Sequence, residues 1–113
     1  MDWINITTES QLEEITTLSF SSSIKGILIF KHSTRCSISS MALNRLERGW
    51  KESVESIPVY LLDLIALRAI SQKIAQLYNV PHESPQILLL KNGKCIYTAS
   101  HSEIDVSEIL AAI

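Results

Sequence analysis

The chain has 113 residues, of which 46% are hydrophobic, and this length is typical of one domain with one core. We therefore expect a single domain over residues 1–113. Ten basic residues stand against twelve acidic ones, which gives a formal net charge of −2. Without an excess of positive charge, neither nucleic acid nor an anionic membrane surface is expected as a partner.

The longest apolar runs have the length of strands, far short of the roughly 20 residues that a membrane-spanning helix needs. The first residues lack the basic stretch and apolar segment of a secretory signal, so we expect a cytoplasmic protein. Thiols stay reduced in that compartment, which disfavours a disulfide between Cys36 and Cys95. The two cysteines form no C-x-x-C pair, so no metal site is expected either.

Hydrophobic periodicity predicts alternating strands and helices along the chain. In chain order, these are a short strand at 3–6, a helix at 9–19, a strand at 26–32, a helix at 38–50, a strand at 58–64, a helix at 67–78, strands at 86–90 and 95–98, and a helix from 105 onward. Thr8 and Gln11 have the spacing of a capping box, as do Asp105 and Glu108. Asn92-Gly93 between two apolar runs predicts a β-hairpin.

Strands joined by helices are expected to run parallel, whereas a hairpin makes the last two strands antiparallel. The predicted fold is therefore a three-layer α/β/α arrangement, with a mixed sheet of four to five strands and helices on both faces. This order of elements resembles the thioredoxin-like fold.

Cys36 is the strongest candidate for chemistry, because it lies between a buried strand and the helix that follows it. The free N–H groups of a helix N-terminus favour an anion, so a thiol at that place ionises more easily and becomes nucleophilic. Arg35 and Lys31 add positive charge nearby in the sequence, and Ser37, Ser39 or Ser40 could donate hydrogen bonds to the sulfur. The candidates for contacting the substrate on this loop are Thr34, Arg35, Ser37 and Ser39. The simpler alternative is a cysteine that only packs.

Ser84-Pro85 comes just before the first strand of the hairpin, at the sheet end that also carries Cys36. X-Pro bonds are cis in only about 5 to 6% of cases. The combination with Cys36 nevertheless favours a cis bond, which would offer the backbone of Ser84 to a bound disulfide. His82 precedes this proline and is a candidate for lining the same groove, and the alternative is a solvated loop residue.

Three segments together resemble the monothiol bacilliredoxin family of the bacillithiol system. They are Lys31-His32-Ser33-Thr34-Arg35-Cys36-Ser37-Ile38-Ser39-Ser40-Met41-Ala42, His82-Glu83-Ser84-Pro85-Gln86 and Lys91-Asn92-Gly93-Lys94. The resemblance covers essentially the whole chain. It differs at Ser37, where the family often has proline.

The resemblance implies a thioredoxin-like enzyme that removes bacillithiol from S-bacillithiolated proteins. Cys36 would be its nucleophile and Pro85 its cis-proline, and bacillithiol would be a co-substrate rather than a tightly bound cofactor. Ser39 stands where C-x-x-C oxidoreductases have their second cysteine, so only a monothiol cycle is available. Cys95 follows the hairpin turn, and a strand of six residues, roughly 20 Å, separates it from the Cys36 end. A disulfide needs Cα atoms within about 7 Å, which makes Cys95 a structural residue.

Two alternatives remain open. The chain could be a non-catalytic interaction module with the same fold, or it could use another low-molecular-weight thiol, such as coenzyme A or glutathione. We expect a monomer in each case.

Overall fold

The computed structural model describes residues 1–50 and 56–113. In chain order, its elements are β1 (Ile4–Asn5), α1 (Ser10–Leu18), β2 (Ile27–His32), α2 (Ser37–Gly49), β3 (Val59–Asp63), α3 (Arg68–Tyr78), β4 (Gln86–Lys91), β5 (Lys94–Ser100), the 3₁₀ helix η2 (His101–Glu103) and α4 (Val106–Ala111). Every element predicted from the sequence is present, within a few residues of its expected bounds. The short helix η2 was not predicted. None of the helices in the described ranges is both long and apolar enough to span a bilayer.

The five strands form one mixed sheet in the order β1-β3-β2-β4-β5. β3 pairs in parallel with both β1 and β2, whereas β4 is antiparallel to β2 and to β5. β2 is the central strand, and all six of its residues are buried. This explains why its sequence is apolar on both faces.

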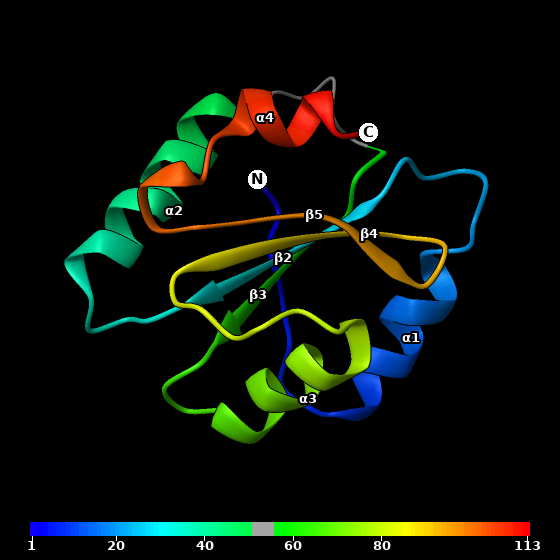
Figure 1. The fold of residues 1–113 in the computed structure, drawn as a ribbon, viewed down its shortest axis with the longest axis horizontal. Helices are drawn as coiled ribbons and strands as arrows, with labels where there is room; N and C mark the ends of the chain where they lie inside the picture. Colours follow the sequence, from blue (N-terminus) through cyan, green and yellow to red (C-terminus); the bar gives the residue numbers. More distant parts are fainter. Residues whose placement is uncertain (51–55) are drawn as a thin grey trace.

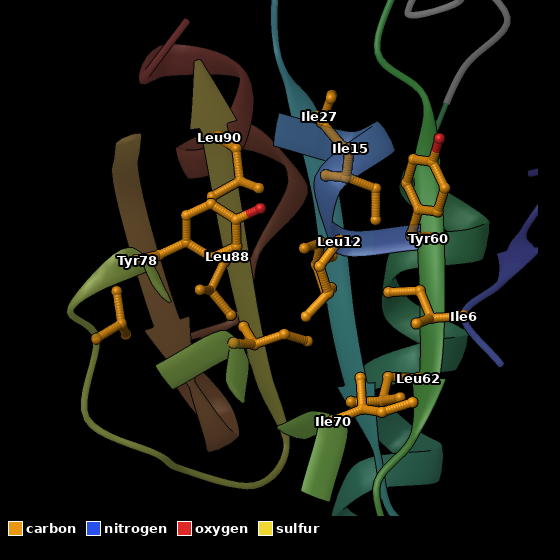
Figure 2. Packing of buried hydrophobic residues seen from close by; sticks show 13 residues of the cluster. Ile6, Leu12, Ile15, Ile27, Tyr60, Leu62, Ile70, Tyr78, Leu88 and Leu90 are labelled. Atoms are coloured by element: carbon orange, nitrogen blue, oxygen red, sulfur yellow. The ribbon is translucent and has the colours of Figure 1, made fainter. Parts of the chain in front are cut away.

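Helices cover both faces of the sheet, so the predicted three-layer α/β/α architecture is confirmed (Figure 1). α1 and α3 lie on one face, and α2 and α4 lie on the other. Alternate residues of β2 enter different clusters, since Ile27 and Ile29 pack with α1 and α3, whereas Leu28 and Phe30 pack with α2 and α4. Figure 2 shows the first of these clusters, where the helices close over β2, β3 and β4.

The hairpin turn forms as predicted, whereas both capping boxes form only in part, since no hydrogen bond joins Asp105 and Glu108 in the described ranges. Asn92 and Gly93 have φ angles of 53° and 76°, the positive values that a two-residue hairpin turn of this kind requires. The Asp105 carboxylate accepts a hydrogen bond from the Ser107 N–H and so caps α4. Only half of the first capping box forms: Gln11 Oε1 accepts from the Thr8 N–H at 3.0 Å, but the Thr8 hydroxyl bonds to the Ser10 and Gln11 side chains instead of a backbone N–H of the helix.

Strand register determines which loops meet at the edge where β2 ends. His32 is opposite Asp63, the last residue of β3, and Lys31 is opposite Gln86, the first residue of β4. The loop from β2 to α2 and the loop before β4 therefore leave the sheet at the same edge. Residue 100 of β5 pairs with Gln86, which places η2 at this edge as well.

Candidate active site

Cys36 is the N-cap residue of α2 and is half-buried at the edge described above. Its N–H donates to the Ser33 carbonyl at 3.2 Å, which closes a tight turn after β2, and its own carbonyl accepts from the Ser40 N–H at 3.1 Å. The thiol makes no cap hydrogen bond to the helix. The backbone alone therefore holds Cys36 in place, and its sulfur is left uncommitted at the start of a 13-residue helix.

Ser39 fixes the shape of this turn from inside the protein. Its side chain is fully buried, and its hydroxyl accepts a hydrogen bond from the Ser33 N–H at 3.0 Å. The same oxygen lies 2.7 Å from Nδ1 of His32, at the end of β2. Since the hydroxyl is buried and already bonded, it is closed to a substrate in this structure.

The His32 side chain packs beneath this turn. Its ring stacks on Phe30 with centroids 5.7 Å apart, and burial lowers its pKa below the ordinary 6.5, although the Asp63 carboxylate opposes this shift. A neutral ring can accept the Ser39 proton at Nδ1. His32 therefore completes the packing beneath the turn.

The other residues predicted around Cys36 are on the surface. Thr34, Arg35 and Ser37 are all exposed, and the two ion pairs found in the described part of the chain do not involve Arg35. These side chains are neighbours of the half-buried thiol in the sequence and supply exposed polar groups and one cation. Ile38 and Met41, in the first turns of α2, are also largely exposed.

The Ser84–Pro85 peptide bond is cis, the isomer expected from the sequence. Pro85 is buried, Ser84 is partly buried and His82 is exposed. The structure thus brings these residues to the edge of the sheet that Cys36 occupies. Their roles toward a substrate stay predictions.

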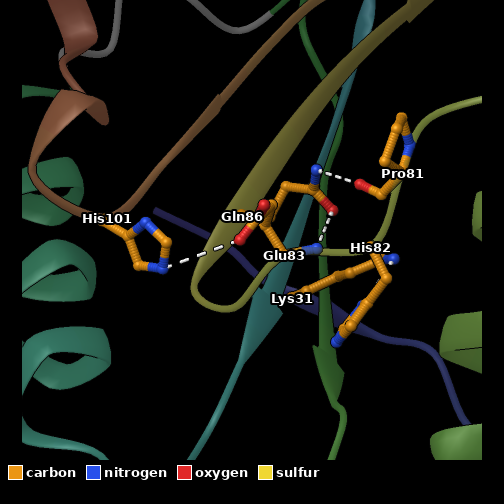
Figure 3. Close-up of polar contacts among 6 residues, drawn as sticks. All are labelled: Lys31, Pro81, His82, Glu83, Gln86 and His101. Carbon is orange, nitrogen blue, oxygen red and sulfur yellow. Dashed lines mark hydrogen bonds and ion pairs between the residues drawn. The ribbon is translucent and has the colours of Figure 1, made fainter.

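The Gln86 side chain forms hydrogen bonds to two residues of the loop before Pro85 (Figure 3). Its amide is almost completely buried; Nε2 donates to the Pro81 carbonyl at 3.0 Å, and Oε1 accepts from the Glu83 N–H at 3.4 Å. One side chain therefore ties both sides of His82 to β4. Sequence analysis did not identify Gln86, because its pattern is that of an ordinary strand residue.

Lys31 was expected only as a positive charge near Cys36 in the sequence, and the structure shows it in a more unusual environment. Its side chain is fully buried, yet its ammonium forms no ion pair with a carboxylate within the described ranges. Nζ instead donates to the Ser71 carbonyl of α3 at 3.1 Å and lies 3.3 Å from Nδ1 of His82. Burial lowers the pKa of Lys31 to about 8.

His101 connects η2 to the same loop. Its N–H donates to the Pro85 carbonyl at 3.1 Å, and its ring is 3.9 Å from the Glu83 carboxylate, an ion pair when the ring is protonated (Figure 3). Arg45 of α2 donates to the His101 carbonyl at 3.2 Å. Nothing in the sequence around His101 indicates these contacts.

Cys95 lies away from this edge. It pairs with Leu90 on β4, four residues beyond Gln86, so about 13 Å of strand separates it from the site edge. Its thiol donates to the Tyr97 carbonyl at 3.3 Å, and burial raises its pKa above the ordinary 9.0. This environment is that of a packed strand residue.

No cluster of three or more potential metal ligands from His, Cys, Asp and Glu occurs in residues 1–50 and 56–113. Cys36 presents one thiol at this edge of the sheet, and a thiolate can carry out thiol–disulfide exchange by attacking one sulfur of a disulfide.

Comparison with solved structures identifies the fold. A protein with a thioredoxin fold, provisionally assigned as an oxidoreductase, is 29% identical with a TM-score of 0.80, over 96% of this chain and 91% of that one. The thioredoxin of Malassezia sympodialis matches with 21% identity and a TM-score of 0.69, covering 98% of this chain and 87% of the other. The thioredoxin of Fasciola hepatica matches with 15% identity and a TM-score of 0.67, covering 96% and 94%.

The family model described as monothiol bacilliredoxin BrxC matches residues 4–109, which include every predicted site residue. Together with the thioredoxin fold and the single thiol at the edge of the sheet, this match assigns the chemistry to thiol–disulfide exchange. The chain belongs to the monothiol bacilliredoxin family and is a thiol–disulfide oxidoreductase.

Proposed function

We propose that this protein removes bacillithiol from S-bacillithiolated proteins by a monothiol cycle with Cys36 as its nucleophile. The observation that carries the proposal is the position of Cys36: its half-buried thiol begins α2, makes no cap hydrogen bond and shares its edge of the sheet with Ser84–Pro85. The family match supports the same chemistry.

In the first step, the Cys36 thiolate attacks the bacillithiol sulfur of the mixed disulfide. The sulfur–sulfur bond to the target protein breaks, and the target cysteine leaves as a thiolate that takes up a proton from water. The product is a Cys36–bacillithiol disulfide. In the second step, an external thiolate attacks this disulfide, releases Cys36 and is itself oxidised.

Two features of the chain support a cycle without an internal resolving cysteine. Ser39 stands where the second cysteine would be, so this position supplies no thiol. Its hydroxyl is hydrogen-bonded to His32 and Ser33. About 13 Å of strand separates Cys95 from Gln86 at the site edge, whereas a disulfide requires a Cα separation of less than about 7 Å.

We propose that Thr34, Arg35 and Ser37 contact the small thiol, because they are exposed beside the nucleophile. Ser84, Pro85 and His82 would face the target protein or the small thiol from the other loop. Ser39 would act indirectly, by holding the turn on which Cys36 lies.

The test is to incubate the reduced protein with a bacillithiolated protein substrate and to follow both partners by intact mass. The target should lose one bacillithiol, and Cys36 should gain one. Cys36→Ser should abolish the transfer, whereas Cys95→Ala should retain it. No transfer, or equal transfer by Cys36→Ser, would favour a non-catalytic interaction module instead.

The same assay identifies the carrier when it is repeated with glutathionylated and coenzyme A-modified forms of one target. We expect bacillithiol to be transferred fastest. If another thiol is transferred faster, the mechanism is unchanged but that thiol, rather than bacillithiol, is the substrate.

A further inference from the structure

We propose that Lys31 is a positioning residue: its ammonium donates to Nδ1 of His82 and thereby presents the ring's Nε2–H as a hydrogen-bond donor to a disulfide bound at Cys36. The proposal rests on the proposed function, because it adds a donor to the same site. His82 would then favour release of the departing thiolate by donating a hydrogen bond to it.

The contacts of the ring determine its tautomer. Nδ1 of His82 lies 3.3 Å from Lys31 Nζ and 3.3 Å from the Ser71 hydroxyl. An ammonium has only donors, so the nitrogen that faces it must carry the lone pair. The ring proton is therefore on Nε2, which has no hydrogen-bond partner in the described ranges, on a residue that is exposed.

The surrounding charges favour the neutral ring. Burial lowers the pKa of His82 first, and the Lys31 charge lowers it further, whereas the neighbouring Glu83 carboxylate raises it. Glu83 is itself directed toward His101, 3.9 Å away. Lys31 approaches from β2 and Ser71 from α3, so both packed elements present donors to Nδ1.

The register places this ring and the nucleophile at the same edge of the sheet. Lys31 lies at the end of β2, opposite Gln86 in the register, and the turn that carries Cys36 follows two residues later. The Gln86 amide holds Pro81 and Glu83 on either side of His82. In Figure 3, Lys31 meets the His82 ring beneath this loop, while Gln86 and His101 hold the rest of it.

The first test uses NMR of the imidazole nitrogens and needs no activity. We expect the Nε2–H tautomer in the wild-type protein. In Lys31→Met, we expect a mixture of tautomers and a pKa of His82 that rises toward its ordinary value of 6.5. A wild-type ring protonated at Nδ1, or a Lys31→Met variant with unchanged tautomer and pKa, would overturn the proposal.

The second test separates the contact of His82 Nδ1 with Lys31 from the hydrogen bond that Nε2–H would donate, and it leaves Lys31 unchanged. His82→Asn keeps an acceptor where Nδ1 lies but has no counterpart to Nε2–H, whereas His82→Leu loses both. Both variants should transfer bacillithiol about tenfold more slowly, the effect of one hydrogen bond made in the transition state. Only His82→Leu should also show faster amide exchange at residues 82–84. Gln76→Leu, an exposed change on α3, is the control and should match the wild type.

The outcomes distinguish the two proposals. Wild-type rates in His82→Asn would refute the donor role even if Cys36 is active. A protein that is inactive toward every mixed disulfide but keeps the Nε2–H tautomer would refute the proposed function and the donor role of His82. It would not refute the contact between Lys31 and His82.

Discussion

The Ser39 hydroxyl oxygen lies 2.7 Å from Nδ1 of His32, and this contact joins the first turn of α2 to the end of β2. The residue that replaces a resolving cysteine therefore has a structural task of its own. It also accepts the Ser33 N–H at 3.0 Å, so that the turn bearing Cys36 is closed from within. A cysteine at position 39 would serve these two hydrogen bonds poorly, because a thiol is a weak donor and acceptor.

Ser39→Ala should lower the free energy of unfolding by about 1–3 kcal/mol, because the change leaves the Ser33 N–H and the buried His32 ring without their partner. Urea unfolding measures this loss. Ser40→Ala is the matched control, since Ser40 is the next residue of α2 but is exposed. Its effect should stay within about 0.5 kcal/mol of zero. Equal effects of the two changes would show that the Ser39 network contributes nothing to stability.

Gln86→Leu should loosen the loop that precedes Pro85, because it removes the partners of the Pro81 carbonyl and the Glu83 N–H. Water can reach this exposed loop, so the loss of stability should be small, about 1 kcal/mol. Amide hydrogen exchange at Glu83 should become faster. Gln86→Glu retains an acceptor for that N–H and should change the exchange rate less. If the Glu83 amide exchanges at the same rate in both variants, Gln86 Oε1 does not protect this N–H and only the bond to Pro81 remains.

Cys95→Ala should leave the rate of bacillithiol transfer unchanged, because Cys95 lies along β5 away from the site edge. Its half-buried thiol packs against the cluster of α1 and α3, so the free energy of unfolding should fall by about 1 kcal/mol. Intact mass after transfer should still show one adduct. A variant that forms the adduct but no longer regenerates free Cys36 would make Cys95 the resolving thiol.

The sequence was sufficient for the fold because its signals are local. The apolar run of β2, the Asn92-Gly93 turn and the Asp105 cap each act within a few residues, and each appears in the structure as expected. The strand order then follows from helical crossovers and the hairpin. Cys36 was found in the same way, since a strand followed by a helix defines its position.

The hydrogen bonds that hold the loops around the site could not be predicted, because they join residues that are far apart in the sequence. Lys31 and His82 are 51 positions apart, and Arg45 and His101 are 56 positions apart. Nothing local to Lys31 indicates that its ammonium is buried without a carboxylate. His101 has a positive φ of 57°, which is uncommon for a residue other than glycine and has no marker in the sequence.

Lys31 should make the stability of the protein depend on pH in the alkaline range. Its pKa is about 8 in the folded protein, compared with 10.5 for an ordinary lysine. Between these values the unfolded chain binds more protons than the folded one, so the free energy of unfolding rises with pH. Below the folded pKa, the buried charge lowers stability by its full amount, on the order of 3 kcal/mol.

Lys31→Met should remove this rise. From about pH 7 to about pH 9.5, wild-type stability should increase by about 2 kcal/mol relative to the variant, as measured by urea unfolding under reducing conditions. Taking the difference between the two proteins cancels the opposite effect of Cys95, whose raised pKa lowers stability as the pH passes its ordinary value of 9.0. Lys25→Met, an exposed change just before β2, is the control and should follow the wild type. A Lys31→Met variant that parallels the wild type through this range would mean that the buried ammonium is solvated in solution, and that its contact with His82 is not maintained there.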